Sequence, residues 1–103
     1  MITLYEVKEW LRLDLDSDYE DNIIEGLISV SSSVIEIGTG VTEEYIKECT
    51  DKTLKNLYRM AQLIIIANRY NERSTEDKAE TSFLTQIEAR YGLLKSIWEQ
   101  KAT

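Results

Sequence analysis

The segment from about Asp51 to Arg73 constrains the fold most, because its apolar residues lie on every face of a helix. Its apolar residues occupy all sides of a wheel with 3.6 residues per turn: Leu54, Leu57, Tyr58, Met60, Ala61, Leu63, Ile64, Ile65, Ile66, Ala67 and Tyr70. A helix of this kind must be covered on all sides. Polar residues divide it into apolar runs too short to cross a bilayer. We therefore predict the central helix of a small all-α domain, or a helix covered partly by other subunits.

The composition argues against an enzyme. A chain of 103 residues with 43% hydrophobic residues fits one helical domain, residues 1–103. Histidine, the commonest general base and neutral metal ligand, is absent. The lone cysteine, Cys49, has no partner for an internal disulfide, which indicates a reducing, cytosolic setting. We expect no catalytic, metal-binding or cofactor-binding residues, no cofactor and no secretory signal.

Charge is distributed unevenly along the chain, whose net charge is −7. No lysine or arginine lies between Arg12 and Lys47, where nine acidic residues occur: Asp14, Asp16, Asp18, Glu20, Asp21, Glu25, Glu36, Glu43 and Glu44. Nucleic-acid and membrane binding both need clustered Lys and Arg, so this half argues against specific DNA binding and against an anionic membrane surface. It is compatible with a passage through which DNA slides without sticking. The alternative is a solvated acidic face that aids solubility.

Two capping boxes predict the first two helices. Thr3–Glu6, supported by a hydrophobic staple, predicts a short helix that ends near Leu11. Ser17–Glu20, after a polar loop, predicts the start of a long helix that ends at Gly38–Gly40. The apolar stripe of this second helix comprises Ile23, Ile24, Leu27, Ile28, Val34 and Ile35, with Ser31 on the same face.

The second half of the chain predicts a short helical turn at 42–47 and a helix capped by Thr50 or Asp51. Residues 74–81 are the most polar stretch and predict a mobile connection or a weakly anchored helical extension. The C-terminal helix, residues 82–100, has a narrow seam that we expect to pack within the same subunit: Leu84, Ile87, Tyr91, Leu94 and Trp98. The predicted fold class is all-α, a small helical bundle of three long helices plus a short N-terminal helix.

One motif partly matches a calcium-binding loop. Asp14, Asp16, Asp18 and Glu25 match positions 1, 3, 5 and 12 of an EF-hand loop. Position 6 of that loop requires glycine for a sharp turn, and here it is Tyr19. The predicted capping box would also start a helix inside the loop. We therefore expect no metal site.

The order of these motifs resembles the small head–tail connector (adaptor, head-completion) proteins of tailed bacteriophages and prophages. The likeness covers about residues 1–73. It rests on the opening Leu4-x-Glu6-Val7-Lys8-x-Trp10-Leu11-Arg12-Leu13-Asp14, the Ile23-Ile24-x-x-Leu27-Ile28 stretch, the Thr39-Gly40 helix stop and the Tyr70-x-Glu72-Arg73 end of the central helix. The chain departs from the family pattern at Val41, where a basic residue is common, and in lacking a proline before the central helix.

The resemblance implies a structural phage protein, not an enzyme. Members assemble as a ring, generally dodecameric, beneath the portal, where the ring extends the DNA channel and presents a platform for the stopper or tail. The implied partners are other copies of the chain, the portal protein and a stopper or tail-completion protein. DNA would pass through without specific binding, and no membrane is involved. The implied locations are the host cytoplasm during assembly and the head–tail junction of the virion. The alternative is a small helical protein-binding regulatory or adaptor domain.

Two segments are the candidate contact sites. The polar end of the central helix offers inter-subunit or portal contacts: Arg69, Tyr70, Glu72 and Arg73. The acidic segment offers docking or channel-facing residues: Asp14, Asp16, Asp18, Glu20, Asp21 and Glu25. Head-to-tail assembly needs two different complementary patches, and arginine forms forked contacts with carboxylates. The alternative is that Arg69 and Arg73 are solvated charges that favour the helix dipole.

Overall fold

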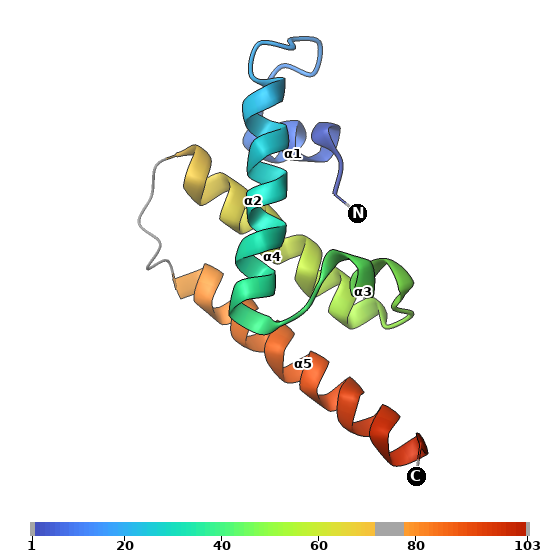
Figure 1. Ribbon diagram of the computed structural model, residues 1–103. Helices are drawn as coiled ribbons and strands as arrows, with labels where there is room; N and C mark the ends of the chain where they lie inside the picture. The colour runs from blue at the N-terminus through green and yellow to red at the C-terminus, as the bar shows by residue number, and fades with distance from the viewer. Residues whose placement is uncertain (1, 72–77, 103) are drawn as a thin grey trace.

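The computed structural model describes residues 2–71 and 78–102, with side chains to residue 96. These residues form five helices and no strand: α1 (Leu4–Leu11), α2 (Asp21–Thr39), α3 (Glu43–Glu48), α4 (Lys52–Tyr70) and α5 (Lys78–Ala102) (Figure 1). The predicted all-α class, with three long helices and a short N-terminal one, is therefore confirmed. None of the described helices is both long enough and apolar enough to traverse a bilayer.

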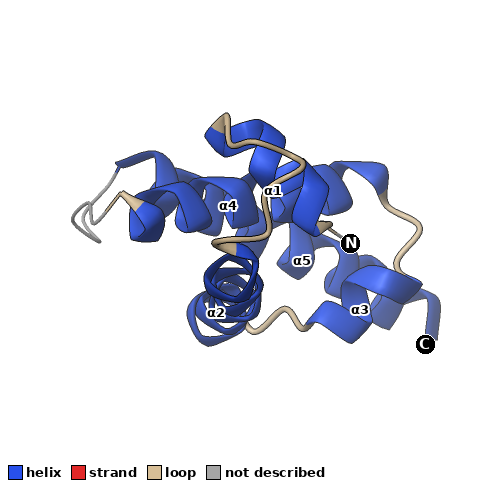
Figure 2. Cartoon of the chain, turned by 90° about the horizontal axis from the view of Figure 1, so that it is seen from above, coloured by secondary structure: helices blue, strands red, loops and turns tan. Residues whose placement is uncertain are grey.

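α4 is the central helix, as its all-round apolar pattern predicts. It contacts α1, α2, α3 and α5. Figure 2 shows α4 lying across the molecule, with α1 on one side and α2 and α3 on the other. Its buried residues point in several directions: Leu54, Tyr58, Ala61, Gln62, Leu63, Ile65, Ile66 and Asn68. The other helices of the same chain therefore supply most of the cover that this helix requires.

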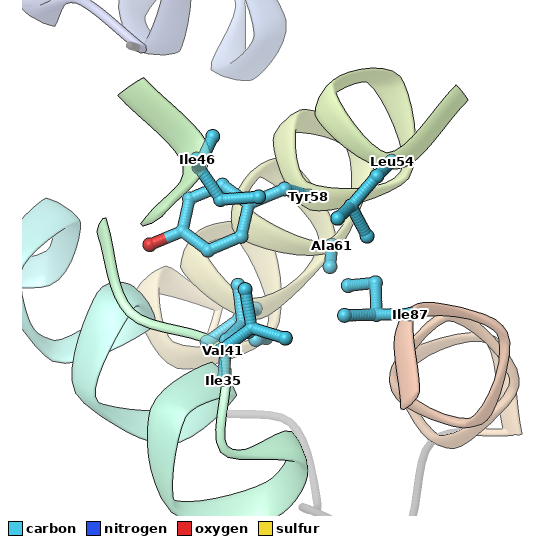
Figure 3. Packing of buried hydrophobic residues seen from close by; sticks show 8 residues of the cluster. Ile35, Val41, Ile46, Leu54, Tyr58, Ala61 and Ile87 are labelled. Carbon is cyan, nitrogen blue, oxygen red and sulfur yellow. The ribbon is translucent and has the colours of Figure 1, made fainter. Parts of the chain in front are cut away.

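The core divides into two clusters along α4. The larger one joins one face of α4, from Leu54 to Ile65, to α2, α3 and α5 and contains Ile35, Val41, Ile46, Leu54, Tyr58, Ala61, Ile65 and Ile87 (Figure 3). The smaller one joins another face of α4, at Leu63 and Ile66, to α1 and the start of α2: Ile2, Val7, Ile24, Leu63 and Ile66. Full burial of one such side chain contributes about 1.5–3 kcal/mol. The two clusters give different faces of α4 different neighbours.

Most predicted helix ends are confirmed. Thr3, Thr42 and Asp51 each accept a hydrogen bond from the backbone N–H three residues later, at 3.2, 3.1 and 2.9 Å. Such a cap satisfies one of the free N–H groups in the first turn. Gly40 ends α2 with φ +80°, a conformation that glycine adopts without steric cost.

The second capping box is a wrong prediction. α2 begins at Asp21, and Glu20, at its N-cap position, makes no side-chain cap. The Ser17 hydroxyl instead accepts a hydrogen bond from the Tyr19 N–H at 3.4 Å, while the Ser17 carbonyl accepts one from Lys8 Nζ at 2.7 Å. Residues 14–20 therefore stay in a loop, and the Lys8 ammonium on α1 is hydrogen-bonded to it at the Ser17 carbonyl.

The start of the last helix also differs from the prediction. α5 begins at Lys78, so residues 78–81 form its first turn, whereas residues 74–77 of the predicted connection lie outside the described residues. Glu80, in this polar stretch, is buried and accepts a hydrogen bond from Asn68 Nδ2 at 3.0 Å. The seam of α5 does pack within the subunit, as predicted. Ile87 is buried and Leu84, Tyr91 and Leu94 pack against the larger cluster, while the Trp98 side chain lies outside the described ones.

One member of the predicted stripe on α2 faces outward. The stripe buries Ile24, Ser31 and Ile35, but Ile23 is 60% exposed. Val30 and Ile37, which follow it at seven-residue steps, are exposed as well. Consecutive residues are separated by about 100° around a helix. The buried line through Ile24 therefore turns Ile23 towards solvent, and α2 presents a second apolar line on its outer side.

Candidate interaction surfaces

A buried lysine holds the loop before α2. Lys8, on α1, is 3% exposed, and its Nζ lies 2.6 Å from Asp21 Oδ1 besides donating to the Ser17 carbonyl. A buried ammonium is costly unless it is paired and hydrogen-bonded. The middle of the loop and the first residue of α2 are thus both held to α1. The sequence patterns predict no role for Lys8, whose one signal is its place in the opening motif.

The two predicted contact segments meet inside one chain. The Tyr70 hydroxyl, at the end of α4, donates to Glu20 Oε2 at 2.5 Å, and this hydrogen bond raises the pKa of Tyr70. Arg69 turns towards α5, where its Nη2 lies 4.0 Å from Glu80 Oε1. Glu72 and Arg73 lie outside the described residues. The end of α4 and the loop therefore form one continuous surface at this end of the molecule.

We call residues 14–19 the acidic loop; all of them are exposed, whereas the preceding Leu13 is half-buried. Asp14, Asp16 and Asp18 all face solvent, and Asp14 Oδ1 accepts a hydrogen bond from the Asp16 N–H at 3.0 Å. Tyr19 is 89% exposed, and Leu15 is also exposed. Of the other predicted acidic residues, Glu25 is exposed on α2, while Glu20 and Asp21 are engaged by Tyr70 and Lys8. Within the described residues, no three acidic or cysteine side chains converge as a metal site.

A pocket lies at the other end of α4, between the N-terminal segment, α3 and α4. Its volume is about 390 Å³, and it is lined by Ile2, Ile46, Lys47, Lys55, Asn56, Tyr58, Arg59 and Gln62. We call it the cation-rimmed pocket, because its apolar residues are buried while Lys47, Lys55 and Arg59 are exposed. Burial raises the pKa of the Tyr58 hydroxyl, which remains a neutral donor.

The rim cations differ in how far they are neutralised. Arg59 Nε donates to Glu6 Oε2 at 2.7 Å, so its charge is shared with α1. Lys47 Nζ lies 3.9 Å from Glu43, a loose pair one turn away. No ion pair of Lys55 is found among the described residues. The sequence places Lys55 and Arg59 one helical turn apart, but only the packing of α3 against α4 brings Lys47 to them.

Buried polar contacts fix how the helices cross. Gln62 Nε2 on α4 donates to Ser31 Oγ and Ser32 Oγ on α2, at 3.2 and 3.1 Å. Arg90 on α5 makes a forked contact with Asp51, with Nε and Nη2 at 3.0 and 2.7 Å from the two carboxylate oxygens. The guanidinium, together with the Leu54 N–H, lowers the pKa of Asp51 to about 2. These contacts hold the acidic loop and the cation-rimmed pocket at fixed places on one framework.

Comparison with known proteins agrees with the resemblance in the opening motifs. A family model described as phage gp6-like head-tail connector protein matches residues 1–99. No curated protein and no solved structure matches the chain significantly. The family match extends past the first 73 residues and includes most of α5. The chain therefore belongs to the phage gp6-like head–tail connector family of structural virion proteins.

Proposed function

We propose that this chain is a ring-forming adaptor between the portal of the capsid and the stopper or tail, where the ring extends the DNA channel. The family match over residues 1–99 carries this proposal. The surface of the chain supports it, because a ring built head to tail needs two unlike patches on each subunit. The acidic loop and the cation-rimmed pocket are two such patches: the loop carries carboxylates, and the pocket rim carries Lys47, Lys55 and Arg59.

The acidic residues fit a ring through which DNA passes. Glu25 and Glu36 are exposed on α2 and give this helix a negative surface apart from the acidic loop. Phosphates are repelled by such a surface, so DNA would slide past it without being held. On this proposal the subunits assemble in the host cytoplasm, and the ring then stays at the head–tail junction.

The direct test is decoration of purified portal complexes. The chain should co-sediment with portals, and electron microscopy should show added density with ring symmetry below each portal. Deletion of its gene should leave DNA-filled heads and separate tails, and supply of the chain in trans should restore joining. Normal phage yield after deletion would contradict the proposal. Binding to a host regulatory protein without portal binding would favour the small regulatory or adaptor domain instead.

The end of α4 is the proposed portal contact. Arg73→Glu should leave the helical signal and the melting temperature nearly unchanged while preventing head–tail joining, because a forked arginine contact to a carboxylate becomes a repulsion. Lys52→Glu, an exposed charge reversal at the opposite end of α4, is the matched control. Full joining by an Arg69→Glu, Arg73→Glu double variant would remove these residues from the contact.

A further inference from the structure

The acidic loop and the cation-rimmed pocket lie at opposite ends of α4. Lys55 is on the pocket rim, whereas Tyr70 holds the loop through Glu20. Fifteen residues of α-helix separate Lys55 from Tyr70, a rise of about 22 Å at 1.5 Å per residue. Figure 1 shows the loop at the end of α2 that points away from α3. A loop fixed to Lys8 and Tyr70 therefore does not reach the pocket of its own chain.

The lining of the pocket defines what would occupy it. Its volume of about 390 Å³ is at the lower end of the range of binding sites, about 300–1,000 Å³. Ile2, Ile46 and Tyr58 are apolar walls that favour an apolar or aromatic group. Gln62 Oε1 is buried without a hydrogen-bond partner among the described residues, so an occupant with a donor would be favoured. The cations on the rim favour carboxylates beside that group.

The acidic loop carries these chemical groups in one short stretch. Tyr19 is the most exposed large hydrophobic side chain among the described residues, and its phenol supplies both an aromatic ring and a donor. Asp16 and Asp18 are exposed beside it, and neither forms an ion pair within the described part of the chain. Leu15 adds a second exposed apolar group. An exposed aromatic flanked by unpaired carboxylates matches an apolar pocket flanked by cations.

We propose that the acidic loop of one copy inserts Tyr19 into the cation-rimmed pocket of the next copy, with Asp16 and Asp18 against Lys47 and Lys55. This inference rests on the proposed ring, since a contact between two different patches propagates head to tail and closes when the rotation allows. It names the contact that joins neighbouring subunits.

The contact is weak in isolation. An aromatic side chain buries about 150–250 Å². Stable protein–protein interfaces bury at least about 1,200 Å² in total. The free chain is accordingly monomeric or a small oligomer, and the portal raises the local concentration of subunits until the ring closes.

Disulfide trapping tests this contact directly. In a Cys49→Ser background, one chain carries Ser17→Cys in the acidic loop and another carries Asn56→Cys on the pocket lining. The two are mixed at high concentration under mild oxidation. The mixed disulfide between positions 17 and 56 should form about tenfold faster than either symmetric dimer. Thr85→Cys, exposed on α5, is the matched control and should cross-link to position 56 only at the background rate.

Charge reversal shows whether the cross-link reports the proposed geometry. Lys47→Glu with Lys55→Glu in the Asn56→Cys chain should slow trapping about tenfold at low salt and less at high salt. Asp16→Lys with Asp18→Lys in the Ser17→Cys chain should restore the rate of trapping with the charge-reversed pocket chain. Tyr19→Ala should also slow trapping, because the aromatic side chain that enters the pocket is lost. If Ser17→Cys and Thr85→Cys form disulfides with Asn56→Cys at equal rates, the proposed contact is wrong. It is also wrong if the charge reversals leave the rate for position 17 unchanged.

A portal experiment separates this inference from the proposed function. Portals that capture the chain without any 17–56 disulfide, in solution or on the portal, would leave the connector role standing and overturn the contact. Loss of portal capture by the Lys47→Glu, Lys55→Glu variant, again without the disulfide, would assign the pocket to a portal segment and also overturn it. A chain that shows the disulfide but never binds portals would support the contact and refute the connector role.

Discussion

Replacement of Lys8 by methionine tests the contact that holds the acidic loop. Methionine has a similar length and apolar stem but no charge, so the change removes two interactions of the ammonium. These are the 2.6 Å ion pair with Asp21 and the 2.7 Å hydrogen bond to the Ser17 carbonyl. We expect Lys8→Met to lower the free energy of unfolding by about 2–3 kcal/mol.

The magnitude follows from the burial of the partners. Removal of one partner of a fully buried ion pair costs about 3–5 kcal/mol, because the other charge is left without compensation. Here the Asp21 side chain as a whole is 28% exposed although its Oδ1 is buried, so water solvates part of the carboxylate and lowers the cost. The lost hydrogen bond to the charged group costs about 1.5–3 kcal/mol, which is consistent with the expected loss of stability.

Urea unfolding followed by circular dichroism measures this loss, and the melting temperature should fall by about 8–24 °C. The control is Lys8→Met with Asp21→Asn, which removes the isolated carboxylate and should recover part of the stability. Limited proteolysis should also cut the loop faster in the single variant. A loss below about 0.5 kcal/mol, as for an ordinary surface substitution, would refute the claim that Lys8 holds the loop.

Three further outcomes are expected. Ile65→Ala should cost about 2–5 kcal/mol in urea unfolding, because this fully buried side chain leaves a cavity between α4 and its neighbours; an unchanged midpoint would contradict its place in the core. Thr3→Ala should cost about 1 kcal/mol through the lost N-cap, whereas Thr3→Ser should cost little. The pKa of Asp51 is lowered from 3.8 to about 2, so its carboxylate stabilises the fold above pH 4 and loses this contribution as the pH falls towards 2. The stability difference between wild type and Asp51→Asn should shrink over that range, and a constant difference would contradict the Arg90 contact.

The positions of most helices follow from local sequence patterns. Thr3, Thr42 and Asp51 cap helices because a short side-chain oxygen reaches the free N–H groups of the first turn wherever it stands before a helical stretch. The all-round apolar pattern predicts α4 as the central helix because such a surface has no stable exposed face. The opening motif and the end of the central helix indicate the family.

Local patterns fail where a distant charge competes with them. Ser17 has the sequence of a helix cap, yet it lies in a loop, where its carbonyl accepts a hydrogen bond from Lys8 on α1. Glu80 stands in the most polar stretch of the chain, yet Asn68 and Arg69 draw it into the interior. Periodicity predicts which residues share a face of a helix. It does not predict which side chains of another helix will contact that face.

The placement of the candidate interaction surfaces is decided by tertiary structure alone. The sequence indicates an acidic segment and a polar end of α4 as separate candidates, and packing joins them through Tyr70 and Glu20. It also builds an opposite surface from Ile2, Lys47 and Lys55, which stand far apart in the sequence. The physical reason is that charge and apolar area act through space, so a surface exists only once the helices have fixed which side chains stand side by side.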